Sequence, residues 1–480
     1  MEIWVRGGSR NFQLELGMVG GETLSWERFA RFIFEKMAET KLPGLSVAAV
    51  RGEEVVWKGA FGVRNLALGL PATPATLYGI GSVTKSFTAL AIMQLAEQGK
   101  LSLDDPVEEY VPMKVRPGGE PIRIRHLMCH TSGIPALAYA EAVIREVTGA
   151  GENWLPIASY SDLLAFMADA GGWAIARPGE RWFYLNEGYV LLGAVVERCS
   201  GLPYEEYVKR NVLVPLGMER SFFRKDEVEN DPNAATPYVV TRDGERKPST
   251  YPYGAISADG GLVSSVLDLA RYIAMYLGWG EAGGVRLVSR GAVEEMETPQ
   301  VTVPWQGPFG EEGYGYGLQI LPDFFGRKLV GHGGSVLVAT AYMGFIPEEG
   351  VGIALLANGS GYPLSQLGMY GLALMLGEDP EGLPFVQWDK ALAELVGVYE
   401  TYKGTLQAQV RRRGDLLYLE IRDKYTDLIV PLVPEALAGD VRKFYALQRG
   451  RRLPVEFRLR GGEIDLIYER YLLRKRGKLP

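Results

Sequence analysis

The sequence predicts an α+β protein: an antiparallel sheet flanked by helices, with an inserted all-helical segment, followed by a small all-β barrel. Three observations predict this class. Strand-like apolar runs occur at residues 45–61 and again after residue 304, helical patterns fill roughly 101–265, and short alternating strands recur after residue 388. Because the early and late strands complete one sheet, we interpret the helices between them as an insertion.

Composition limits the classes of protein to consider. The chain has 480 residues, 47% of them hydrophobic and 23% charged, which is ordinary for a globular protein of two to four domains. A net charge of −7 without a long basic run gives no reason to expect a nucleic-acid partner. The N-terminus lacks a signal-peptide core and no apolar run is long enough for a membrane span, so a cytoplasmic location is expected. Cys129 and Cys199 are expected to be free thiols.

The N-terminal part is expected to begin with an irregular lead-in, residues 1–24. Residues 26–40 carry apolar side chains at helical spacing, with Ser25 as a cap. The apolar runs 45–50 and 54–61 are separated by a short polar turn and predict a hairpin.

Residues 82–100 are expected to form a helix with one apolar face, because apolar side chains recur there at roughly helical spacing. This helix places Ser82 at its first turn and Lys85 about one turn later, on the same side as Ser82. A serine hydroxyl becomes a nucleophile when a base takes its proton, and a neutral lysine amine can be that base. The positive end of the helix dipole and partial burial both disfavour the ammonium. The same turn offers backbone N–H groups to an oxyanion. The S-x-x-K pattern is common by chance, so this interpretation depends on further motifs.

The remaining elements of the main domain follow from periodicity and turn residues. The predicted helices cover 123–130, 161–170, 186–199, 204–216 and 267–277. The predicted strands cover 314–321, 328–331, 339–346 and 351–357, and an apolar helix covers 364–376.

The C-terminal part begins after a linker, residues 378–388. Short alternating strands are predicted at 406–410, 416–421, 428–433, 444–448, 455–459 and 464–468, with glycines between them. Residues 389–480 hold 19 Lys and Arg against 13 Asp and Glu, a net of +6, so the rest of the chain carries −13. Opposite charges can help this domain dock on its own body or on a neighbouring subunit.

Two loops supply groups that complement Ser82. Tyr184, just before the helix at 186–199, can act as phenolate or proton relay beside the Lys85 cation, and Asn186 can bind a substrate carbonyl and steady Lys85. Each can also be an ordinary loop tyrosine and a helix cap.

The second loop, Gly331-His332-Gly333-Gly334-Ser335, follows the strand at 328–331. Its glycines let a substrate backbone approach, and the Ser335 N–H can pair with that of Ser82 as an oxyanion hole. The alternative is a turn with a surface histidine.

His126 and His130 have the i, i+4 spacing of helical metal ligands. No third ligand has suitable spacing and no H-E-x-x-H occurs, so packing beneath the turn at 131–133 is the favoured interpretation and no metal is expected.

The order Ser82-x-x-Lys85, Tyr184-x-Asn186, His332-x-Gly334 resembles the serine β-lactamase and penicillin-binding-protein superfamily. Three further stretches resemble its class C-like branch, at residues 125–135, 177–180 and 260–265, and the resemblance covers roughly residues 25–376. It implies that 25–377 is a catalytic domain of the β-lactamase and transpeptidase type. Residues 389–480 resemble the lipocalin-like barrels that some peptidase members append, which restrict the cleft or build an oligomer.

The resemblance implies a role for each matching residue. Ser82 would form the acyl-enzyme, and Lys85 and Tyr184 would share the acid and base work. The residues with binding roles would be Asn186, which contacts substrate, His332 and Gly334, which line the opposite side of the cleft, and Ser335, whose N–H completes the oxyanion hole. Members that hydrolyse β-lactams usually carry lysine where this chain has His332, and the His332 form resembles D-aminopeptidases and esterases.

The sequence therefore predicts a serine hydrolase, foremost a peptidase for small or D-configured residues. A carboxylesterase for short-chain esters uses the same chemistry and is the nearest alternative. A catalytically inert, penicillin-binding sensor is an alternative of another class. No cofactor motif is present in the sequence, so none is expected, and the expected partners are a small peptide or ester and further copies of the chain.

Overall fold

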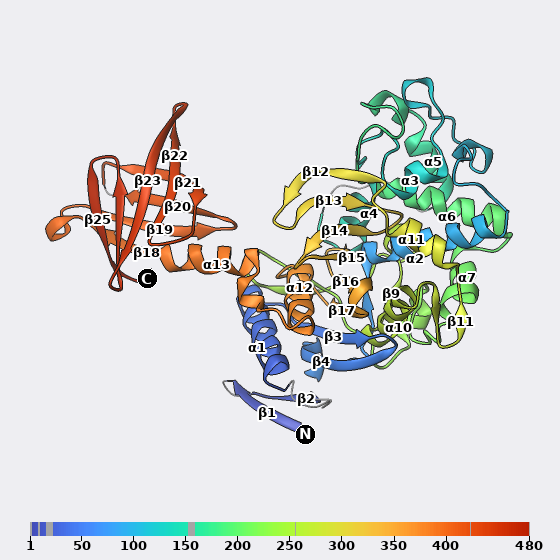
Figure 1. The fold of residues 1–480 in the computed structure, drawn as a ribbon, viewed down its shortest axis with the longest axis horizontal. Coiled ribbons are helices and arrows are strands. Elements are labelled where there is room, and N and C mark those ends of the chain that lie inside the picture. The colour runs from blue at the N-terminus through green and yellow to red at the C-terminus, as the bar shows by residue number, and fades with distance from the viewer. Residues whose placement is uncertain are drawn as a thin grey trace. The chain divides into compact units, whose positions relative to one another are not determined.

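The computed structural model describes residues 2–7, 10–15, 23–151, 159–254, 256–422 and 424–479. The chain divides into two compact units, residues 1–378 and 379–480. Each unit is built around its own sheet (Figure 1). No helix in the described ranges has both the length and the apolar character needed to cross a bilayer.

The first unit, here the catalytic unit, contains an antiparallel sheet of nine strands among its described residues, in the order β12-β13-β14-β15-β16-β17-β3-β4-β5. The N-terminal strands are β3 (Gly44–Arg51), β4 (Glu54–Asn65) and β5 (Leu70–Pro71). The later strands are β12 (Val301–Gly307), β13 (Gly310–Tyr314), β14 (Gln319–Phe324), β15 (Arg327–Ser335), β16 (Thr340–Ile346) and β17 (Val351–Ala357). Pairing of β17 with β3 joins the two ends of the unit, as the α+β prediction requires.

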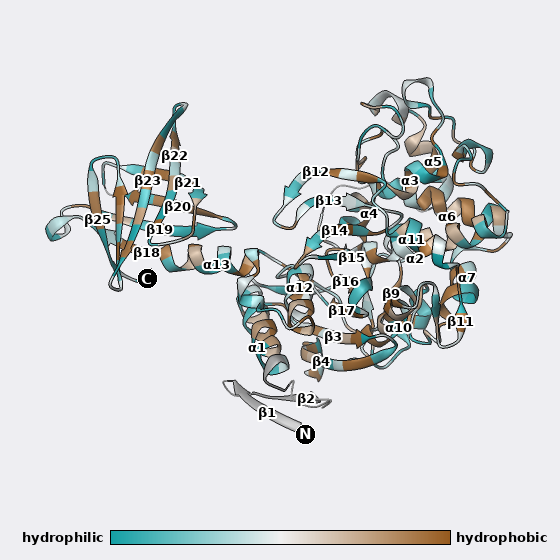
Figure 2. Cartoon of the chain, in the orientation of Figure 1, coloured by the Kyte–Doolittle hydropathy of each residue, from teal (hydrophilic) through white to brown (hydrophobic). Residues whose placement is uncertain are grey.

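Helices cover both faces of this sheet. On β17, Ile353 lies toward Phe29 of α1 (Thr23–Thr40) and Gly371 of α12 (Leu364–Met375). The neighbouring Gly352 lies on the opposite face, against Ile273 of α10 (Val266–Leu277). β3 and β17 are therefore buried on both sides, and Figure 2 shows β3 as hydrophobic along most of its length.

The inserted helices lie between β5 and β12. Those that build the site are α2 (Thr84–Glu97), α3 (Ile124–Met128), α4 (Tyr139–Val147), α6 (Asn186–Ser200) and α9 (Ser257–Gly260). α2 does not have the single apolar face expected of it: every residue from Thr84 to Leu95 is buried. Its polar residues Thr84 and Thr88 are consequently bonded to the α9 segment, through the Leu262 N–H and the Ala258 carbonyl.

The second unit is a closed antiparallel barrel, here called the barrel unit. In its described residues eight strands close the ring: β18 (Gly397–Glu400), β19 (Gln407–Arg413), β20 (Leu416–Arg422), β21 (Asp427–Ala436), β22 (Val441–Gln448), β23 (Arg451–Arg460), β24 (Glu463–Tyr468) and β25 (Tyr471–Gly477). Its interior is filled by apolar side chains such as Val410, Leu417 and Phe457.

The predicted fold class is confirmed, but some element boundaries are wrong. Two strands, β1 (Glu2–Gly7) and β2 (Arg10–Glu15), pair antiparallel where an irregular lead-in was expected. α1 begins two residues before Ser25, the expected cap. The strand predicted at 314–321 is two strands, β13 and β14, with a turn between them.

In the barrel unit the sequence predicts six strands and misses β18 and β25. The stretch expected to be a linker also contains the start of α13 (Pro384–Leu395). Leu392 and Leu395 of this helix belong to the barrel core. α13 is therefore part of the barrel unit rather than a flexible connection.

Candidate active site

The turn before α2 presents Ser82 at the start of the helix. A short 3-10 helix, η1 (Gly81–Val83), leads directly into α2. Gly81 has a φ of 52°, a left-handed conformation that glycine adopts without strain. Ser82 is partly exposed, whereas Lys85, one turn later, is completely buried. The first N–H groups of such a helix have no partner within the helix, so they can meet an oxyanion.

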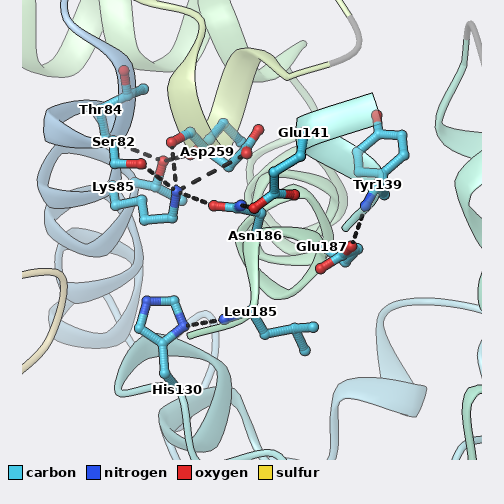
Figure 3. Close-up of polar contacts among 12 residues, drawn as sticks. Ser82, Thr84, Lys85, His130, Tyr139, Glu141, Leu185, Asn186, Glu187 and Asp259 are labelled. Atoms are coloured by element: carbon cyan, nitrogen blue, oxygen red, sulfur yellow. Dashed lines mark hydrogen bonds and ion pairs between the residues drawn. The ribbon is translucent and has the colours of Figure 1, made fainter. Parts of the chain in front are cut away.

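Three oxygens surround Lys85 Nζ (Figure 3). Lys85 Nζ lies 3.1 Å from Ser82 Oγ, 2.8 Å from Asn186 Oδ1 and 2.8 Å from the carbonyl oxygen of Asp259. The amide and the backbone carbonyl can only accept hydrogen bonds from Nζ. Two of the positions on the nitrogen are therefore fixed, and the third faces the serine hydroxyl.

Two buried carboxyl groups lie near this lysine. Asp259 Oδ2 is 4.0 Å from Lys85 Nζ, and burial raises the pKa of Asp259 to about 7, although the lysine opposes this rise. Glu187 accepts a hydrogen bond from the Tyr139 N–H at 3.0 Å, and burial likewise raises its pKa. Among the described residues, one oxygen of each carboxyl group has no hydrogen-bond partner. The Asp259 carboxyl group thus lies where a proton can be held close to Lys85.

Tyr184 and Asn186 reach Lys85 from the segment that leads into α6. The Tyr184 ring centroid lies 5.0 Å from Lys85 Nζ. The Asn186 side chain is held from both ends, because its Oδ1 accepts from Lys85 and its Nδ2 donates to Glu141 Oε1 at 3.3 Å. Glu141 is exposed on α4, so its carboxylate faces the same space as the nucleophile.

The edge of β15 lies opposite. β15 pairs with β16 along its whole C-terminal half but with β14 only as far as Gly331. Val336 N–H donates to the Ala339 carbonyl, so these two residues form a hydrogen-bonded pair at the end of the ladder between β15 and β16. Hydrogen-bonded and non-hydrogen-bonded pairs alternate along an antiparallel ladder. The N–H and C=O groups of Gly333 and Ser335 therefore point away from β16. These groups are left at an edge that β14 does not cover.

Two glycines allow this edge to approach Ser82. A Cβ atom on Gly334 would lie 1.9 Å from the Ile80 carbonyl oxygen and 3.1 Å from the Ser82 nitrogen. A Cβ atom on Gly81 would lie 2.6 Å from the Ser335 nitrogen. A larger residue at Gly334 or Gly81 would push β15 away from the turn that carries Ser82. The N–H groups of Ser82 and Ser335 would then also lie farther apart.

His332 is buried on β15 and is not the surface histidine of the alternative interpretation. Its Nδ1–H donates to the Gly333 carbonyl at 2.6 Å, and its Nε2 accepts from the Tyr314 hydroxyl at 2.9 Å. Burial lowers the pKa of His332 to about 3. The ring is therefore neutral with both nitrogens occupied, and it brings no positive charge to the site.

These residues line one open groove of about 590 Å³ in the catalytic unit. Its described lining includes Ser82, Glu141, Tyr184, Asn186 and the β15 edge, and is continued by residues of β16 and of the segment at 360–365. The described lining residues include the carboxylate of Glu141 and neither lysine nor arginine.

The structure brings together the residues that the sequence singles out for catalysis, and it places three further acidic residues beside them. The three are Asp259, Glu187 and Glu141. Asp259 directly precedes the glycines of the stretch at 260–265, and a charge beside an apolar, glycine-rich run is a usable signal. Glu187 and Glu141 look like ordinary helix residues in the sequence, and nothing there marks them.

Among the described residues, the two other histidines belong to no cluster of three or more candidate metal ligands. His126 Nδ1 accepts the Arg123 N–H at 3.1 Å at the start of α3. His130 is buried beside Tyr184.

Comparison with known proteins matches both units. The β-lactamase family model matches residues 29–374, and the Pab87 octamerisation domain model matches residues 380–474. The solved octameric penicillin-binding protein homologue from Pyrococcus abyssi is 50% identical, with a TM-score of 0.90, covering 94% of this chain and 100% of its own.

Two further relatives match with lower identity. Penicillin-binding protein 4* of Bacillus subtilis (strain 168) is 28% identical over 411 residues, covering 81% of this chain and 86% of its own. A D-stereospecific amidohydrolase from Streptomyces sp. is 26% identical with a TM-score of 0.56, covering 71% of this chain and 96% of its own. The chain therefore belongs to the β-lactamase family, within the serine hydrolase superfamily that its motifs resemble.

Proposed function

We propose that this protein is a serine peptidase that acts through an acyl-enzyme on Ser82. It would cleave the amide bond that follows a small or D-configured residue with a free α-amino group. The observation that carries the catalytic part is the arrangement around Lys85 Nζ. Two carbonyl-type acceptors occupy two of its positions, so a neutral amine directs its lone pair at Ser82 Oγ.

In the acylation step, Lys85 Nζ takes the proton of the Ser82 hydroxyl while Oγ attacks the substrate carbonyl carbon. The carbonyl oxygen becomes an oxyanion that the N–H groups of Ser82 and Ser335 stabilise. As the scissile C–N bond breaks, the leaving amine receives the proton, by way of Lys85 or Tyr184. A water molecule then attacks the acyl-enzyme through the same groups and restores Ser82.

The charge of the groove supports the substrate class. The Glu141 carboxylate can form an ion pair with a substrate ammonium group. The described lining residues include no lysine or arginine that could pair with a substrate carboxylate. His332 is neutral where β-lactamases usually carry lysine. This combination favours an aminopeptidase or amidase over a carboxypeptidase or a β-lactam hydrolase. The D-stereospecific amidohydrolase among the relatives is consistent with the stereochemical part of the proposal.

The paired substrates D-alanyl-p-nitroanilide and p-nitrophenyl butyrate separate the peptidase from the esterase. We expect the amide to be cleaved with the higher kcat/KM and Ser82→Ala to remove its turnover. Turnover of the ester alone would establish the esterase. Stable acylation by a penicillin, without turnover of either substrate, would establish the sensor.

Glu141→Gln tests the recognition of the amine. We expect KM for D-alanyl-p-nitroanilide to rise about tenfold, with little change for the N-acetylated amide, which has no ammonium. Glu146→Gln, on the same helix but outside the groove, is the matched control. Equal effects of Glu141→Gln on both amides would refute this role.

We also propose that the barrel unit assembles the protein into a homo-oligomer. The match to an octamerisation domain and to an octameric homologue supports this. Light scattering on the full chain is expected to give a particle of eight chains, and a monomer at micromolar concentration would contradict it.

A further inference from the structure

His130 occupies an unusual backbone position next to the segment that carries Tyr184. It follows α3 and has a φ of 60°, in the left-handed region that few residues other than glycine adopt. Only 1% of its surface is exposed. This conformation turns both its carbonyl group and its ring toward residues 183–185.

His130 binds the backbone on both sides of Tyr184. Its carbonyl oxygen accepts the Phe183 N–H at 2.8 Å, and its Nδ1 accepts the Leu185 N–H at 3.0 Å (Figure 3 shows the second bond). Its ring centroid lies 4.1 Å from the ring centroid of Tyr184. One residue therefore restrains the two neighbouring peptide groups and the aromatic face of Tyr184.

The ring must be neutral to do this, because Nδ1 accepts a hydrogen bond and the proton is left on Nε2. Burial lowers the pKa of His130 well below its usual value, which is consistent with a neutral ring. Among the described residues, Nε2 has no hydrogen-bond partner although it is buried. An unpaired buried N–H is unfavourable for folding, so stability alone does not explain a histidine here.

We propose that His130 is a positioning residue of the active site, which fixes residues 183–185 so that Tyr184 and Asn186 meet Lys85. This inference rests on the proposed function, because it assigns Tyr184 a part in proton transfer. Asn186 follows directly on the restrained segment and lies 2.8 Å from Lys85 Nζ. A displacement of about 1 Å in such groups can reduce turnover about 100-fold.

Two substitutions separate the acceptor from the bulk of the side chain. His130→Asn keeps an acceptor at the same number of bonds from Cβ as Nδ1, and asparagine tolerates a positive φ. His130→Leu places a methyl group there. We expect His130→Leu to lower kcat 10- to 100-fold with KM changed less than threefold, and His130→Asn to recover at least tenfold of that loss. His126→Leu is the matched control, because His126 Nδ1 likewise accepts a backbone N–H, that of Arg123, and is not part of the contacts of Tyr184 or Asn186 described above.

Amide hydrogen exchange gives a readout that needs no substrate. Exchange at residues 183–185 is expected to accelerate in His130→Leu and to stay slow in the wild type and in His130→Asn. In a Tyr184→Phe background, His130→Leu is expected to cause a smaller further loss of kcat than in the wild type, because the two changes have the disabling of Tyr184 in common. A purely structural role would instead lower activity of both variants in parallel with melting temperature.

The outcomes distinguish the two proposals. Normal kcat in His130→Leu, or full additivity with Tyr184→Phe, would refute the positioning role while leaving the hydrolase intact. Turnover by Ser82→Ala would refute the hydrolase itself.

Discussion

The catalytic unit and the barrel unit differ in whether they bury charged and polar side chains. The catalytic unit buries Lys85, Asp259, Glu187 and His130 on the elements that form the candidate active site. The barrel unit fills its interior with apolar side chains and turns its charges outward. Even Glu420, which is 5% exposed, alternates with the core residues Leu417 and Leu419 and therefore lies on the outer face of β20, where Arg413 binds it.

This difference fits the proposed division of chemistry and assembly between the two units. Buried ionisable groups are costly unless paired, and they persist where chemistry needs shifted pKa values and fixed protons. Among its described residues, the barrel core holds two tyrosines, Tyr399 and Tyr468, but no carboxylate, lysine, arginine or histidine, which fits a unit that stabilises and assembles the protein. The following substitutions test whether chemistry and assembly are separated in this way.

The largest expected effect is that of Lys85→Met. Methionine fills a similar volume without a base, so kcat should fall at least about 1,000-fold. The pKa of Asp259 is already raised to about 7, so its carboxyl group can take up a proton when the lysine is absent and the fold should persist. Steady-state kinetics and circular dichroism measure this, with Lys100→Met, exposed beyond the end of α2, as the control.

The second effect is confined to the barrel unit. Phe457→Ala removes a completely buried ring, and the expected loss is about 3–5 kcal/mol in the free energy of unfolding of residues 379–480. Turnover per active site should change less than twofold, because the ring belongs to a separate core. Urea unfolding followed by circular dichroism is the measurement. Leu472→Ala, which is 52% exposed, is the control, and a tenfold loss of kcat in Phe457→Ala would break the separation.

A smaller effect concerns the pH dependence of the catalytic unit. Burial raises the pKa of Glu297 to about 7, against the opposing charge of Lys328. Below pH about 4 this carboxyl is protonated in both states. As the pH rises, the unfolded chain releases the proton first. The free energy of unfolding therefore falls by about 3 kcal/mol as the pH rises to about 7.

Glu297→Gln cannot ionise and should flatten the dependence of stability on pH in this window. Tryptophan fluorescence during urea unfolding reports it well, because eight of the nine tryptophans precede residue 379. An unchanged pH dependence would show that ionising Glu297 in the folded protein costs little free energy.

The smallest effect is expected at the surface of the barrel unit. Arg458 and Glu456 form an ion pair at 2.9 Å with 40% and 32% of their side chains exposed. Exposed pairs contribute about 0–1 kcal/mol, so Arg458→Ala should shift the urea midpoint only slightly. A loss comparable with that of Phe457→Ala would mean that this surface is buried in the assembly.

The sequence predicted the sheet, the insertion and the barrel because each has strong periodicity. It missed β18 and β25, since β18 has only four residues and β25 is rich in Arg and Lys, which resemble loop residues. It misjudged α2, where a helix buried on all sides lacks an apolar stripe.

For the candidate site, spacing along the chain singles out Ser82 and Lys85, and ordered motifs single out Tyr184 and His332. The proposed roles of Asp259, Glu141 and His130 depend on contacts between segments far apart in the sequence. No local pattern encodes those distances. The neutrality of His332 also needs the structure, because it follows from the Tyr314 and Gly333 partners.

The central claim is that Ser82 becomes acylated. Mass spectrometry of the enzyme quenched during turnover of D-alanyl-p-nitroanilide measures this directly. The account predicts an adduct with the mass of the acyl group, located on Ser82 by peptide mapping and absent from Ser82→Ala. Sustained turnover without any adduct, or with the adduct on another residue, would contradict it.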